Sequence, residues 1–84
     1  MADEKTSLTP EQLRKADFMA QLILDLAQCR RDENLSQRQL EALTGLVQPV
    51  IARLERGGVD PRLSTLYSYL LPMGKKLAIV PIDD

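Results

Sequence analysis

Histidine and tryptophan are absent from this chain of 84 residues, and cysteine occurs once, as Cys29. The sequence also contains no phosphate-cradling glycine loop and no cluster of metal-ligand residues, so no group of side chains suggests a catalytic centre. We therefore expect no enzyme activity, no cofactor and no metal. A single cysteine cannot form an intrachain disulfide, and its place in a helical run favours a small buried side chain in a reducing compartment.

Long apolar runs are also missing. No segment is long enough to span a membrane as a helix, and the polar, acidic start MADEKTSLTP lacks the basic region and apolar core of a signal peptide. We therefore expect a cytoplasmic protein. A chain of this length forms one domain with a small core, so association adds stability and a dimer is expected.

The stretch SQRQLEALTGLVQPVIARLERG is spaced like two short helices joined by a tight turn. Ser36 precedes Gln39 by three residues, a capping box that predicts a helix start at Ser36. Leu40 and Leu43 are three apart and predict one apolar face. Gly45 then supplies the positive φ angle of a sharp helix exit. This spacing is typical of a unit that enters a DNA groove.

The second helix of this stretch has an apolar face and a polar face. Pro49 is acceptable in its first turn, where the missing N–H has no intrahelical partner to lose. Gly57 and Gly58 end the helix. An amphipathic helix packs its apolar side inward and leaves its hydrogen-bonding groups outward. The apolar residues at helical spacing are Val50, Ile51 and Leu54, and those largely on the remaining surface are Gln48, Arg53 and Arg56.

These residues resemble the Cro/C1-type, or Xre-type, helix-turn-helix family of bacterial and phage DNA-binding proteins. The resemblance covers about Leu22 to Ile82, and its C-terminal part resembles the HigA-like antitoxins of type II toxin–antitoxin systems. It implies an all-α, lambda-repressor-like domain of four to five helices with a short C-terminal β-strand that pairs across a dimer. The matching positions are Gln37, Leu40, Gly45, Ile51, Leu54 and Glu55.

Two residues depart from the family pattern within the motif. Glu41 stands where the family usually has alanine, so its carboxylate must lean outward or find a partner. Val47 replaces the usual Ser or Thr cap of the second helix, a loss of about 1 kcal/mol of helix stability. Further on, Pro72 disfavours helical geometry in the residue before it, so the final helix is expected to end near Leu71.

The outward side chains of the second helix suit DNA recognition. Gln48 can present its amide to adenine, and Arg53 can donate two hydrogen bonds to guanine. Val50 lies between them and can touch a thymine methyl group. The alternative is that these residues form only a solvated polar face. The resemblance implies base contacts for Gln48, Pro49, Val50 and Arg53, and backbone contacts for Ser36, Gln37, Arg38 and Arg56.

Charge is nearly balanced, with a formal net value of −1. The segment from Arg30 to Arg62 nevertheless holds six arginines and five acidic residues, so the motif is its more basic part. Such a domain binds non-specific DNA weakly and relies on dimerisation and base contacts. The resemblance also implies an ion pair between Arg30 and Glu55, against the alternative of two unrelated surface charges.

Upstream of the motif, Thr9, Pro10 and Gln12 predict a helix start, with a helix that runs to about Asp32. Its residues Leu22, Leu26 and Cys29 suit the face against the motif. Further apolar side chains lie on its other sides. They are either core or a site for a partner protein or the dimer mate. These partner-binding candidates are Phe18, Met19, Ile23 and Leu24.

The C-terminal part predicts a helix through Leu63, Leu66, Tyr67, Leu70 and Leu71, and then a short β-prone run. A lone strand needs an external edge, either the same strand of a second subunit or a sheet of another protein such as a toxin. The predicted dimerisation residues are Leu77, Ala78, Ile79 and Val80. The predicted organisation is a flexible N-terminus (1–8), a helix-turn-helix domain (9–74) and a dimerisation strand with tail (75–84).

Two-fold pairing places the two recognition helices about 34 Å apart, in successive major grooves, so the expected site is an inverted repeat. The resemblance implies an antitoxin that neutralises a ribonuclease toxin from the adjacent gene and represses its own promoter as a dimer. A stand-alone repressor without a toxin is one alternative. A protein-interaction module that has lost DNA binding is another.

Overall fold

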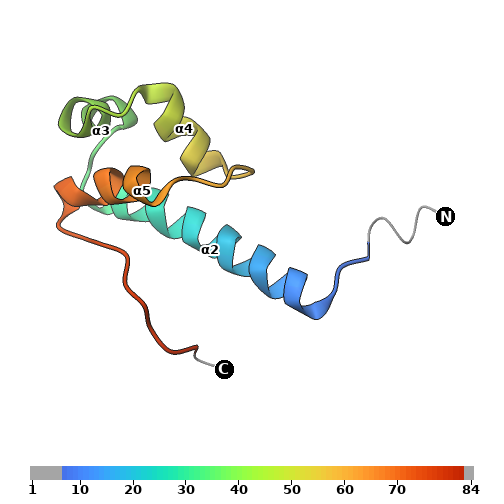
Figure 1. The fold of residues 1–84 in the computed structure, drawn as a ribbon. Coiled ribbons are helices and arrows are strands. Elements are labelled where there is room, and N and C mark those ends of the chain that lie inside the picture. Colours follow the sequence, from blue (N-terminus) through green and yellow to red (C-terminus); the bar gives the residue numbers. More distant parts are fainter. Residues whose placement is uncertain (1–6, 83–84) are drawn as a thin grey trace.

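A computed structural model describes residues 7–82, and every regular element within that range is helical. In Figure 1, α3 and α4 lie above α5 and the C-terminal half of α2, and Arg30 of α2 contacts Glu55 of α4 directly. The all-helical helix-turn-helix architecture predicted from the sequence is therefore confirmed. The elements are α2 (Pro10–Asp32), α3 (Gln37–Thr44), α4 (Gln48–Arg56), α5 (Leu63–Leu70) and the 3-10 turn η1 (Leu71–Met73).

Capping residues define where the first helices of this range begin. Thr9 caps α2 in a reciprocal pair with Gln12, and Ser36 caps α3 in the same way with Gln39. At the other end of α3, Gly45 adopts a left-handed conformation with φ 79°. A residue with a Cβ atom is strained in that conformation, so Gly45 allows the sharp exit that the sequence predicts.

The core lies where α2, α3, α4 and α5 meet. Leu40 and Ile51 are completely buried, as expected, and Tyr69 is buried to the same degree. Leu43, which is 59% exposed, does not share the inward face of Leu40. A helix as short as α3 turns only a narrow stripe towards its neighbours. The rest of the core is Ile23, Leu26, Leu54, Leu66, Leu70 and Met73.

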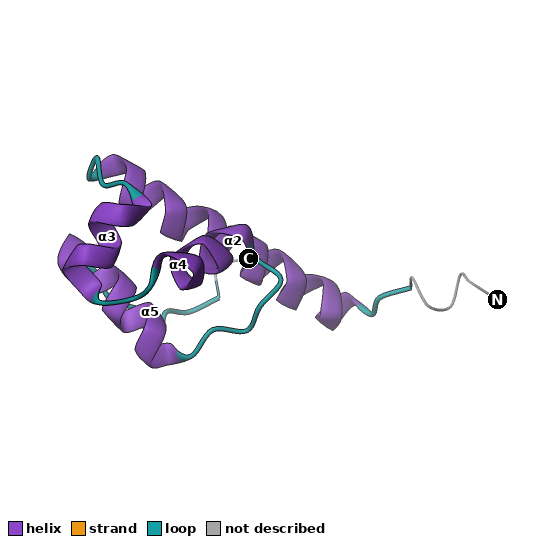
Figure 2. Cartoon of the chain, turned by 90° about the horizontal axis from the view of Figure 1, so that it is seen from above, coloured by secondary structure: helices purple, strands orange, loops and turns teal. Residues whose placement is uncertain are grey.

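The N-terminal half of α2 extends beyond the other helices (Figure 2). Most of its residues before Ile23 are exposed, because the motif and α5 cover only the C-terminal half of this helix. Within residues 7–82, no helix combines the length and apolar character needed to cross a membrane.

The predicted C-terminal β-strand is not formed in the described part of the chain. Residues 75–82 follow η1 without helix or strand, and Ile79 and Val80 are exposed. A β-strand requires a paired edge, and this single chain offers no strand beside the segment within residues 7–82. Residues 1–6 of the predicted flexible N-terminus, and the last two residues of the tail, lie outside the described range.

Candidate nucleic-acid interface

The four predicted base-contact residues all lie in the first two turns of α4. Pro49 and Arg53 are exposed, while Gln48 and Val50 are half-buried. Ile51 and Leu54 hold the opposite side of α4 in the core. Burial of one apolar side fixes the rotation of the helix, so its polar side is presented away from α2 and α5.

The predicted phosphate-contact residues flank this surface. Arg38 in the first turn of α3 and Arg56 at the end of α4 are both exposed. The Ser36 hydroxyl accepts a hydrogen bond from the Gln39 N–H at 3.0 Å, which leaves its own proton available as a donor. The helix-turn-helix geometry thus presents hydrogen-bond donors from two helices.

Gln48 and Gln37 are joined directly. The Gln48 Nε2 group donates to Gln37 Oε1 at 2.7 Å, and Gln37 Nε2 in turn donates to Glu55 Oε1 at 3.1 Å. The predicted base-contact amide is therefore held by a predicted phosphate-contact residue, which is itself anchored on a carboxylate. Such a chain orients the Gln48 side chain before any ligand is bound.

Glu55 is the centre of this network. Arg30 donates to both carboxylate oxygens, with Nε 2.7 Å from Oε2 and Nη2 2.8 Å from Oε1. The side chains of this predicted ion pair are 12% and 7% exposed, respectively. The Tyr69 hydroxyl donates to Glu55 Oε2 at 2.6 Å, and Arg30 Nη1 donates to the Leu35 carbonyl at 2.7 Å. One carboxylate therefore connects α2, α3, α4 and α5.

The electrostatics of this cluster favour its charged form. Burial opposes ionisation of Glu55, but hydrogen bonds from Arg30, Tyr69 and Gln37 outweigh that effect and hold the pKa of Glu55 below its ordinary value. Burial, and then the Glu55 carboxylate, raise the pKa of Tyr69, so its hydroxyl remains a donor. The hydrogen bond to Glu55 likewise raises the pKa of Arg30.

The lowered pKa of Glu55 predicts a loss of stability in acid. Because the folded state binds the Glu55 proton more weakly than the unfolded chain, its contribution is complete above the ordinary carboxyl pKa and disappears as the pH falls through the lowered value. We expect the difference in unfolding free energy between the wild type and Glu55→Gln to narrow on acidification. Urea unfolding at decreasing pH measures this difference, and a constant difference would contradict the prediction.

The four partner-binding candidates on α2 do not share one environment. Phe18 and Leu24 are exposed and Met19 is half-buried, but Ile23 is a core residue. The chain leaves α4 close to Ile23. A Cβ atom added to Gly57 would lie 3.9 Å from the Ile23 side chain, which is ordinary van der Waals contact. Ile23 is therefore corrected from a surface candidate to a core residue.

Two parts of the site were not predicted from the sequence. Tyr69 was missed, although its spacing from Leu66 and Met73 matches an inward helical face. The sequence does not identify the partner of Glu41, which is the backbone of α4: Glu41 Oε2 accepts the Gln48 N–H at 3.1 Å. Val47 makes no side-chain cap, as its residue type predicts.

Comparisons with known proteins agree with this geometry. The helix-turn-helix family profile matches residues 26–80. An HTH-type transcriptional regulator of Haemophilus influenzae is 42% identical over 79 residues, which cover 94% of this chain and 81% of that protein. A second such regulator, from Sinorhizobium fredii, is 36% identical over 62 residues, which cover 71% of this chain and 80% of that protein. A solved chain described as a toxin–antitoxin module from Streptococcus pneumoniae is 34% identical, with a TM-score of 0.69 and coverage of 96% and 91%.

Proposed function

The chain belongs to the Cro/C1-type helix-turn-helix family of DNA-binding transcriptional regulators, and we propose that it is the antitoxin of a toxin–antitoxin pair. In this role it neutralises a ribonuclease toxin from the adjacent gene and represses their shared promoter in the cytoplasm. The outward polar side of α4 carries the DNA-binding part of the proposal. The likeness to the toxin–antitoxin module over 96% of the chain supports the antitoxin part.

In the proposed complex, α4 lies in the major groove of double-stranded DNA. Gln48 pairs with adenine, Arg53 with guanine, and Val50 and Pro49 contact base edges, including a thymine methyl group. Donors on α3 and at the end of α4 bind phosphates and set the register. We propose that these phosphate contacts come from Ser36, Gln37, Arg38 and Arg56.

We propose a homodimer that binds an inverted repeat. The extended segment 75–82 exposes apolar side chains, and pairing with its copy in a second subunit supplies the edge that one chain lacks. The residues proposed for this contact are Leu77, Ala78, Ile79 and Val80.

A stand-alone repressor without a toxin is the second candidate. The regulators of Haemophilus influenzae and Sinorhizobium fredii favour it, because both are described only as transcriptional regulators. The two roles use the same contacts with DNA, but only the antitoxin also binds a toxin. The product of the adjacent gene therefore discriminates between them.

A footprint on the DNA upstream of the chain's own gene, with and without the product of the adjacent gene, tests the proposal. We expect protection of an inverted repeat, and a change in that protection when the second protein is added. Protection that is the same with and without the second protein would support the stand-alone repressor. No protection in either condition would contradict an autorepressor and favour a protein-interaction module.

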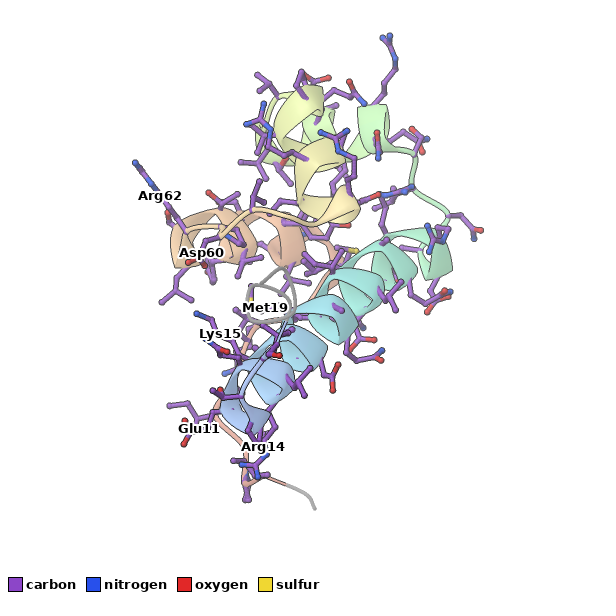
Figure 3. All side chains as sticks on the ribbon, turned by 90° about the vertical axis from the view of Figure 1, so that its right-hand side faces the viewer. Glu11, Arg14, Lys15, Met19, Asp60 and Arg62 are labelled. Carbon is purple, nitrogen blue, oxygen red and sulfur yellow. The ribbon has the colours of Figure 1, made fainter. Side chains whose placement is uncertain are left out.

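The projecting half of α2 is the proposed toxin-binding surface. Phe18 lines a groove with Val80, Pro81 and Ile82 of the C-terminal segment. A second groove contains Met19 and Asp60, whose side chains lie near one another between α2 and the loop before α5 (Figure 3). Apolar surface of this kind, bordered by charged residues, is typical of a protein contact.

Phe18→Ser is expected to weaken capture of the adjacent gene's product at least tenfold, since truncation of a central aromatic anchor costs roughly 2 kcal/mol or more. DNA binding and thermal stability should change little, because Phe18 is 63% exposed. Leu71→Ser, which alters a similarly exposed side chain on η1, is the matched control. Equal capture by the two variants would exclude this surface.

A further inference from the structure

The first turn of α4 lacks a side-chain cap, yet each N–H group of residues 48–50 has a partner. The first N–H groups of a helix have no intrahelical acceptors and need other partners. Val47 at the N-cap offers no side-chain oxygen, Pro49 has no N–H, and the Val50 N–H donates to the Val47 carbonyl at 2.9 Å. The remaining donor is the Gln48 N–H, whose partner is the Glu41 carboxylate at 3.1 Å.

Glu41 holds both ends of the turn between the two motif helices. Its backbone carbonyl accepts the Gly45 N–H at 2.8 Å, where α3 ends. Its half-buried side chain accepts the Gln48 N–H, where α4 begins. A carboxylate at a helix N-terminus also interacts favourably with the helix dipole. A single residue of α3 therefore fixes the start of α4 from outside that helix.

Thr44 supports the same turn from the end of α3. Its hydroxyl donates to the Leu40 carbonyl at 2.7 Å and accepts the Leu46 N–H at 3.0 Å. The turn is thus defined by side chains of α3 and by Gly45. Val47 contributes only its backbone carbonyl.

We propose that Glu41 is a positioning residue for DNA recognition, whose carboxylate accepts the first N–H of α4, a helix that Val47 leaves without a side-chain cap. The two departures from the family pattern thus act on the same helix start, at different N–H groups. Gln48 is then held twice, by Glu41 at its backbone and by Gln37 at its side chain. This inference rests on the proposed DNA-binding role, because three of the four proposed base contacts lie in the first helical turn of α4, which Glu41 holds through the Gln48 N–H.

The position of Glu41 also affects selectivity. A negative charge beside the start of α4 repels the phosphates that would otherwise bind there, so it disfavours sequence-independent contacts. Glu41→Gln and Glu41→Ala both remove this charge, but only glutamine keeps an oxygen that can accept the Gln48 N–H. Comparison of the two variants therefore separates hydrogen bonding from charge.

The free protein provides the first test, by NMR of the Gln48 amide proton. We expect this signal to move upfield in Glu41→Ala and to stay close to its wild-type position in Glu41→Gln, because a lost hydrogen bond shields the proton. Glu33→Ala, which removes an exposed carboxylate at the end of α2, should leave the signal unchanged. An unmoved signal in Glu41→Ala would overturn the proposal.

DNA affinity provides the second test, with the fragment upstream of the chain's own gene and an unrelated duplex of equal length. Loss of a cap changes an equilibrium by about fivefold, so Glu41→Ala should bind the upstream fragment about fivefold more weakly than Glu41→Gln. The two variants should bind the unrelated duplex equally. Equal affinities for the upstream fragment would overturn the proposed role.

Val47→Thr adds an ordinary N-cap to the same helix start, because threonine has the shape of valine and carries a hydroxyl. Val47 is exposed and has the extended backbone of an N-cap residue, so this hydroxyl can reach the Val50 N–H but not the Gln48 N–H that Glu41 binds. We expect Val47→Thr to restore part of the lost thermal stability in Glu41→Ala and to leave the Gln48 amide signal at its Glu41→Ala position. Return of that signal to its wild-type position would show that Glu41 does not hold the Gln48 N–H. If the wild type does not bind the upstream fragment, the proposed function fails, whereas the NMR and stability data still decide how α4 is held.

Discussion

Glu55→Ala is expected to lower the free energy of unfolding by about 3 to 5 kcal/mol, the range for removal of one partner from a buried ion pair. The substitution leaves the Arg30 guanidinium without its carboxylate, and both side chains are largely buried. Tyr69 and Gln37 lose an acceptor as well. Small domains are stabilised by roughly 5 to 15 kcal/mol in total, so this variant should be close to unfolding.

Urea unfolding followed by circular dichroism measures this loss. Glu33→Ala, at an exposed position, is the control and should change stability by less than about 0.5 kcal/mol. Tyr69→Phe removes the hydroxyl that contacts both Glu55 and the Leu26 carbonyl and should cost about 1 kcal/mol. A double-mutant cycle with Arg30→Ala should give a clear coupling energy. A loss no larger than that of the control would show that Glu55 does not hold the four helices together.

Arg53→Ala should weaken binding to the DNA upstream of the chain's own gene by roughly tenfold to a hundredfold. A bidentate contact between arginine and guanine contributes about 1 to 3 kcal/mol of discrimination. Because Arg53 is exposed, its removal should leave the melting temperature nearly unchanged. Affinity for an unrelated duplex should fall much less, so the ratio of the two affinities, measured at a fixed salt concentration, is the informative quantity.

Arg56→Ala is the matched control for Arg53, since it removes the same side chain from the end of the same helix. If Arg56 contacts phosphate, its loss should weaken binding to all sequences alike and reduce the salt dependence by about one unit of slope. Full affinity and selectivity in Arg53→Ala would exclude its proposed base contact. The same uniform loss in both variants would assign both arginines to phosphates.

The positions of the helices followed from local chemistry and could be predicted from the sequence. Thr9 with Gln12, and Ser36 with Gln39, are three residues apart and form their capping boxes without help from the rest of the chain. Gly45 ends α3 for a reason that is equally local. The apolar spacing of α4 predicts which of its sides is buried, because a short helix has only one apolar stripe.

The partners of the polar residues were decided by the tertiary structure. Resemblance implied the Arg30–Glu55 pair, but nothing local links residues 25 positions apart, and Tyr69 joined them only because α5 packs across α2 and α4. Glu41 accepts the Gln48 N–H because the turn after α3 brings the start of α4 beside α3.

Tertiary packing also determined which of the outlying apolar residues are buried. The sequence alone cannot say whether Ile23 faces solvent or a neighbour, because that depends on where the chain leaves α4. The β-prone residues near Ile79 form no strand, although their propensity favours one. The hydrogen bonds of a strand need a second strand beside it, and residues 7–82 do not supply one. Local sequence thus determined the helices and their caps, whereas packing between helices determined the hydrogen-bond network that holds α4.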